Sequence, residues 1–82
     1  NITKTRLARV YLELNKTDKA IQTLQSAEAV NSSAYIQMLL GDAYTQKEDS
    51  QKANVSYETA MKLSDNDSDL QKLIFKKLNN TK

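Results

Sequence analysis

Apolar side chains recur along the chain at intervals of three and four residues, the spacing of one face of an α-helix. Four such stretches cover residues 3–15, 18–30, 34–46 and 51–63. A fifth follows an acidic, turn-forming segment at 65–69. Ser, Thr, Asp and Asn, which cap helix N-termini, lie between the stretches. The pattern therefore predicts five helices joined by short turns, with neighbouring helices antiparallel.

The first half of the chain is echoed in the second half at one fixed interval. Four pairs are identical, Leu7 and Leu40, Tyr11 and Tyr44, Ala20 and Ala53, Ala27 and Ala60, and at the same interval Gly41 corresponds to Ala8 and Tyr57 to Leu24. Leu-Gly-x-x-Tyr followed by Ala-x-x-x-aromatic, at a period of roughly 34 residues, is typical of the tetratricopeptide repeat (TPR). We therefore expect an all-α, TPR-like α-solenoid in which these twelve residues pack the repeats together.

The echo also sets the expected boundaries. Two helix-turn-helix repeats are predicted at 1–33 and 34–66, and a C-terminal capping helix with its tail at 67–82. At the same interval, Leu73 corresponds to Leu40 and Ile74 corresponds to Gly41. Lys77 takes the place of Tyr44 and is expected to face water, because no partner helix follows.

Gly41 is the single glycine of the chain. It falls where the repeat needs a close approach between two helices, so we expect Gly41 against a neighbouring helix and Tyr57 buried. The first helix has no cap before it, and we expect its apolar edge at Leu7, Val10 and Leu14 to be exposed. Either further repeats precede Asn1 in a longer protein, which we favour, or this edge contacts another chain in a weak homodimer.

Composition excludes several classes of function. The 82 residues contain no cysteine and no histidine, which removes thiolate chemistry and the commonest general base and metal ligand. Twelve basic and ten acidic residues leave a net charge of +2, too balanced for a nucleic-acid surface. The acidic run at 65–69 is explained by helix capping. We therefore predict no enzymatic activity, no cofactor and no metal site.

Repeat proteins of this kind usually bind along the concave face lined by the first helix of each pair. That pattern gives a candidate protein-binding set: Thr5, Arg9, Leu12, Tyr35, Met38, Asp42 and Phe75. We expect Tyr35, Met38 and Phe75 to form one apolar patch, since Met and aromatic side chains suit adaptable binding surfaces. Packing of these three as satellite core stays open. Between adjacent helices we expect an Arg9–Asp42 ion pair.

Beyond the repeat, the sequence resembles the C-terminal part of the YfgM family, ancillary subunits of the bacterial SecYEG translocon. The matching residues are Arg6-Leu7-Ala8-Arg9-Val10, Ala20, Leu24, Gly41-Asp42-Ala43, Asp49, Ala53, Tyr57, Ala60 and Leu78-Asn79-Asn80. Glu48 departs from the family pattern, which often has glycine there. The resemblance implies an inner-membrane protein with one N-terminal anchor outside this chain and a periplasmic TPR domain. It also implies protein partners: the translocon, a membrane-anchored periplasmic chaperone and unfolded secreted clients.

The sequence thus predicts a protein–protein interaction module, with the periplasmic, translocon-attached role as the leading hypothesis. Two alternatives stay open. The repeats could have a purely architectural or oligomerising role, or the chain could be a generic TPR adaptor in another complex.

Overall fold

The computed structural model describes residues 2–30, 32–65 and 67–80. They form five helices: α1 (Ile2–Glu13), α2 (Thr17–Val30), α3 (Ala34–Gln46), α4 (Ser50–Leu63) and α5 (Ser68–Asn80). The described residues contain no β-strand, which confirms the all-α, TPR-like solenoid. The bounds of the first four helices lie within two residues of the predicted ones.

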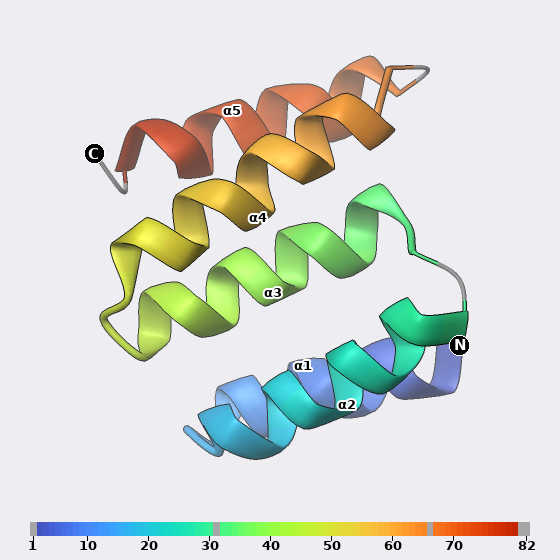
Figure 1. Cartoon of the computed structure of the whole chain (residues 1–82), viewed down its shortest axis with the longest axis vertical. Coiled ribbons are helices and arrows are strands. Elements are labelled where there is room, and N and C mark those ends of the chain that lie inside the picture. The colour runs from blue at the N-terminus through green and yellow to red at the C-terminus, as the bar shows by residue number, and fades with distance from the viewer. Residues whose placement is uncertain (1, 31, 66, 81–82) are drawn as a thin grey trace.

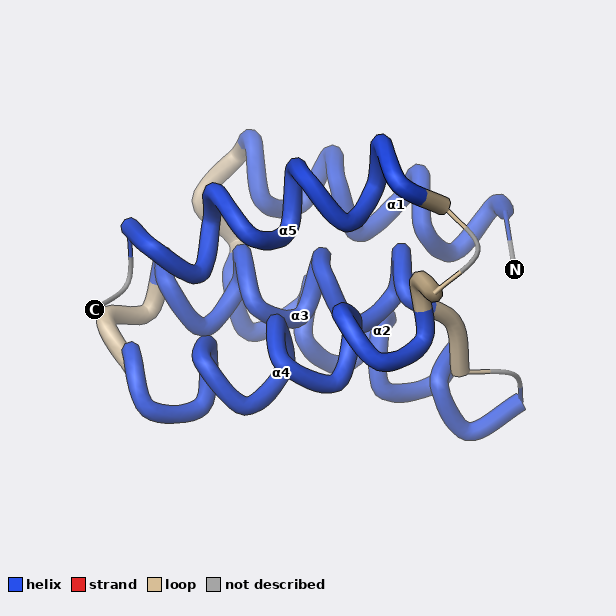
Figure 2. Tube along the Cα trace, turned by 90° about the horizontal axis from the view of Figure 1, so that it is seen from above, coloured by secondary structure: helices blue, strands red, loops and turns tan. Residues whose placement is uncertain are grey.

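The helices stack as two antiparallel hairpins followed by a single helix. The α1–α2 hairpin lies at one end, the α3–α4 hairpin covers it, and α5 lies against α4 at the other end (Figure 1). Seen from above, α1 and α5 lie on one side of the stack and α4 on the other (Figure 2). This arrangement makes α3 the central helix.

The core consists of two hydrophobic clusters that meet at α3. The first lies between α3 and the α1–α2 hairpin and contains Ala8, Ile21, Leu24, Ala27, Ile36, Leu39, Leu40 and Ala43. The second joins α3, α4 and α5 and contains Met38, Ala53, Tyr57, Ala60 and Ile74. Because α3 contributes to both clusters, most of its residues are buried, and it holds the two repeats in one body.

The close approach expected at Gly41 is present, and Tyr57 occupies it. A β-carbon at position 41 would stand 2.7 Å from Cζ of the Tyr57 ring and nearer still to Cδ1 and Cε1. The equivalent positions of the first repeat are Ala8 and Leu24, both fully buried in one cluster. The second repeat therefore pairs a smaller residue with a larger ring.

The capping helix departs from the register of a third repeat. Leu40 is 3% exposed, whereas Leu73, its equivalent one repeat later, is 44% exposed. Instead α5 covers α4 with Leu70, Ile74 and Leu78, which lie one turn apart on one face. With only one side to cover, α5 turns this stripe toward α4, and Leu73 falls outside it.

The apolar edge of α1 is exposed as expected. Leu7, Val10 and Leu14 all keep more than two fifths of their surface open to solvent. Leu7 thus differs from its buried equivalent Leu40, because α1 and α2 cover Leu40 and no described helix covers Leu7. None of the described helices is both long enough and apolar enough to cross a membrane.

Candidate protein-binding surfaces

The apolar patch expected on the α1–α3–α5 side is not formed. Met38 is buried in the second cluster with Tyr57 and Ile74. Tyr35 is half-buried and packs against both clusters, so it lies partly in the core, as the alternative interpretation allowed. This side of the molecule therefore lacks the continuous apolar surface that the sequence suggested.

Phe75 lies away from the other members of the expected patch. Its side chain is more than half exposed, but it comes two residues before Lys77 on α5. Residues two apart on a helix point to nearly opposite sides. Because Lys77 reaches Asp42 on α3, Phe75 points away from α3.

The remaining members of the expected set lie on α1. Thr5 is buried, and Leu12 is half-buried against the first cluster. Arg9 is exposed. The predicted Arg9–Asp42 pair is wrong, because the Asp42 carboxylate is held from the other side by groups on α4 and α5.

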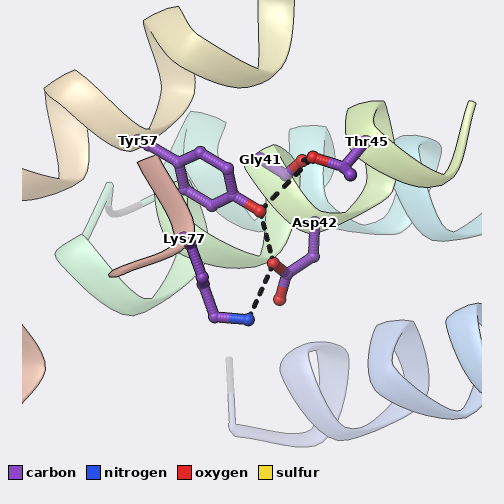
Figure 3. A network of polar contacts seen from close by, with 5 residues as sticks. All are labelled: Gly41, Asp42, Thr45, Tyr57 and Lys77. Atoms are coloured by element: carbon purple, nitrogen blue, oxygen red, sulfur yellow. Dashed lines mark hydrogen bonds and ion pairs between the residues drawn. The ribbon is translucent and has the colours of Figure 1, made fainter. Parts of the chain in front are cut away.

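Asp42 is the centre of a polar network between α3, α4 and α5 (Figure 3). The Tyr57 hydroxyl donates to Asp42 Oδ1 at 2.5 Å, and Lys77 Nζ donates to the same oxygen at 3.0 Å. Thr45 Oγ1 lies 3.5 Å from the Tyr57 hydroxyl and donates to the Gly41 carbonyl at 2.8 Å. The expectation that Lys77 faces water is therefore wrong, since it closes an ion pair between α5 and α3.

Burial raises the pKa of Tyr57 above its ordinary value, and the hydrogen bond to Asp42 raises it further. The phenol therefore stays protonated at neutral pH and acts as a hydrogen-bond donor. A small hollow of about 200 Å³ opens beside it, lined by Asp42, Thr45, Tyr57, Lys77 and Asn80. The polar groups that line this hollow form hydrogen bonds with one another, so few of them are free to bind a ligand. We therefore interpret the network as a link between three helices.

A larger groove runs along α3 on the opposite side, between α2 and α4. Two adjoining pockets of about 370 and 480 Å³ share Gln25, Tyr44 and Lys52, so they form one continuous hollow. Leu40 and Tyr44 of α3 form its floor, and the Lys52 ammonium lies 5.7 Å from the centre of the Tyr44 ring. We call this hollow the α2–α4 groove.

The walls of the α2–α4 groove carry both neutral hydrogen-bonding groups and four charged side chains, Asp18, Glu28, Lys47 and Lys52. Side-chain amides and hydroxyls line it: Gln22, Gln25, Gln37, Ser56 and Thr59. Gln37 is engaged with Glu28, and Val55 adds an exposed apolar side chain on the α4 wall. Amides over an apolar floor suit the main chain of a bound polypeptide.

The described residues contain no cluster of acidic side chains that could hold a metal ion.

The sequence analysis did not find the α2–α4 groove. A groove between the second helices of two repeats depends on how far apart α3 holds them, which spacing along the chain does not give. The one available signal is Gln22 and Gln25 on α2, polar positions beside the buried Ile21 and Leu24.

Comparison with known families agrees with this architecture. The family described as tetratricopeptide repeat-like domain matches residues 1–82, and the chain belongs to it. Domains of this class are generally non-enzymatic and commonly bind protein partners. No curated protein and no solved structure was found to match the sequence.

Proposed function

We propose that this chain is the periplasmic interaction module of an ancillary Sec translocon subunit, and that it binds a polypeptide segment in the α2–α4 groove. The observation that carries the binding site is the groove itself, an open hollow along α3 lined by residues of α2 and α4. The assignment to the translocon is supported by the resemblance to the YfgM family, most specifically at Arg6–Val10 and Leu78–Asn80.

The chemistry of the groove favours a protein ligand over a small molecule. Its open, elongated shape follows α3, and its polar groups are spread along the walls instead of converging on one point. An extended chain could exchange main-chain hydrogen bonds with Gln22 and Gln25, while an apolar side chain rests near Tyr44. Such contacts depend little on sequence, as binding of varied secreted clients requires.

The resemblance also supplies the setting. It implies an N-terminal membrane anchor and a periplasmic location at the bacterial inner membrane. The partners would be the translocon and a membrane-anchored periplasmic chaperone, with emerging clients as transient ligands.

The test is binding of the fluorescently labelled chain to SecYEG in nanodiscs, to the periplasmic chaperone and to an unfolded secreted protein. Val55→Asp places a charge on the groove wall at an exposed site, so it should weaken binding about tenfold without unfolding the chain. The matched control is Phe75→Ser, at a similarly exposed residue outside the groove, which should bind like the parent. Equal affinities of the two variants would contradict the α2–α4 groove as the binding site. Failure of the parent to bind any of the three partners would contradict the translocon role.

A further inference from the structure

Two of the four charged side chains that line the α2–α4 groove are not neutralised. Asp18 and Lys47 pair with each other, since Lys47 Nζ lies 3.0 Å from Asp18 Oδ1. Lys52 and Glu28 form no ion pair with another described residue, although both line the same pocket. The groove therefore presents one cation and one carboxylate that are open to a ligand.

These two charges lie toward opposite ends of the groove. Both α2 and α4 run antiparallel to α3, so they are parallel to each other (Figure 1). Lys52 is the third residue of α4, whereas Glu28 is the third from the end of α2. Val55 comes one turn after Lys52, and Leu40 lies in the middle of α3, so an apolar stretch of the same pocket separates the charges.

Neighbouring groups hold both charges at the groove. The Lys52 ammonium lies 5.7 Å from the centre of the Tyr44 ring, which keeps it over the floor. The Glu28 carboxylate is half-buried and accepts a hydrogen bond from the neutral side-chain amide of Gln37. That bond positions the carboxylate without cancelling its charge. Because solvent screens partly buried charges less than exposed ones, a cation of a ligand would gain most at Glu28.

We propose that the occupant of the α2–α4 groove is an extended polypeptide segment with an acidic and a basic side chain on either side of an apolar one. The acidic side chain pairs with Lys52, the basic one pairs with Glu28, and the apolar one rests between Leu40 and Val55. In an extended chain, side chains two residues apart point to the same face, so all three can enter the groove together.

This inference rests on the proposed function, because it takes the groove as the binding site. It adds a several-fold charge preference to main-chain contacts that depend little on sequence. A segment without charges, or with charges of one sign, would leave at least one groove charge desolvated and unpaired, which disfavours it.

The test uses fluorescence anisotropy of the whole chain with four labelled peptides at low salt. Each is a serine-rich peptide with blocked ends and a central leucine. The positions two residues before and after the leucine carry Glu and Lys, Glu and Ser, Ser and Lys, or Ser twice. The peptide with both charges should bind about tenfold tighter than the uncharged one, because two partly exposed ion pairs each contribute a few-fold. In about 0.5 M salt this advantage should shrink.

Charge variants of the chain assign each end of the groove. Lys52→Glu should weaken binding of the doubly charged peptide about tenfold and should favour a peptide with Lys at both positions. Glu28→Gln keeps an acceptor for Gln37 and should remove only the advantage that the peptide lysine provides. Lys62→Glu, at an exposed residue of α4 that lines neither pocket, should bind like the parent.

The outcomes separate this inference from the proposed function. Equal affinities of the parent for all four peptides would overturn the charge preference, and weakening of all four by Val55→Asp would then show that the groove itself still binds. An unchanged peptide preference in Lys52→Glu would also overturn it. Failure of the parent to bind any peptide would overturn this inference together with the groove.

Discussion

Asn15 and Glu48 occupy equivalent positions in the two repeats, and both adopt a left-handed backbone conformation, with φ angles of 60° and 66°. Each follows the first helix of its repeat. In both places the next N–H donates to the carbonyl five residues back at 2.8 Å, which closes the helix in a Schellman motif. The repeat is therefore present in the backbone of the turns as well as in the packed side chains.

Glu48→Gly should stabilise the protein. A side chain in the left-handed region costs roughly 1–2 kcal/mol, and glycine avoids that cost while adding some entropy to the unfolded chain. We expect a net gain of about 0.5–1 kcal/mol, or roughly 2–8 °C in Tm for a domain of this size. Thermal unfolding checks it.

Asn15→Gly is the matched control for that change. Asparagine tolerates the left-handed region better than glutamate does, so the gain at Asn15 should be smaller. A larger gain at Asn15 than at Glu48 would contradict this explanation of the turns.

Tyr57→Phe should change how stability depends on pH. Folding raises the pKa of Tyr57 from 10.0. The contribution of Tyr57 to the free energy of unfolding is therefore fully present below pH 10 and is lost as the pH rises further. Above pH 10 the unfolded chain releases this proton and the folded chain retains it, which lowers the unfolding free energy by about 1.4 kcal/mol per pH unit.

Urea unfolding of parent and Tyr57→Phe at several pH values provides the measurement. At neutral pH the variant should be less stable by about 1 kcal/mol, for the lost hydrogen bond to Asp42. Above pH 10 that difference should shrink, and within about one further pH unit it should change sign. A difference that stayed constant up to pH 12 would show that burial of Tyr57 does not control its ionisation.

Lys77→Met should loosen α5 without unfolding the rest of the stack. The Lys77–Asp42 pair joins α5 to α3, and both side chains are less than a third exposed. Because the pair is still partly solvated, its loss should cost less than about 1 kcal/mol. Amide hydrogen exchange should show faster exchange in α5, with α3 unchanged.

Lys76→Met tests whether that effect is specific. Lys76 is the exposed neighbour on the same helix, so its replacement removes the same charge without breaking the pair with Asp42. Equal acceleration of exchange in both variants would assign the effect to net charge instead of the ion pair.

The sequence predicts the helices and the packing between repeats because both depend on local spacing. Apolar periodicity locates the helices, and the interval between Gly41 and Ala8 identifies the slot that Tyr57 and Leu24 occupy. The exposed edge of α1 is predicted from its place as the first helix of the stack, and no described helix covers it.

The surfaces could not be predicted in the same way. The position of Phe75 depends on the rotation of α5 about its own axis, which is set by the fit of Ile74 against α4. That rotation also carries Lys77 to Asp42, so the partner of Asp42 comes from a helix much later in the chain instead of from Arg9. The α2–α4 groove depends on the separation of two helices that share only α3 as support.

The central claim is that the two halves of the chain are copies of one packing unit, in which Gly41 and Tyr57 replace Ala8 and Leu24. A double-mutant cycle of Gly41→Ala and Tyr57→Leu tests it, because the double variant rebuilds the pair of the first repeat in the second. Alone, Gly41→Ala forces a methyl group against the Tyr57 ring and should cost about 1–3 kcal/mol by urea unfolding. In the Tyr57→Leu background the same change should cost at least about 1 kcal/mol less. An equal cost of Gly41→Ala in both backgrounds would contradict the claim.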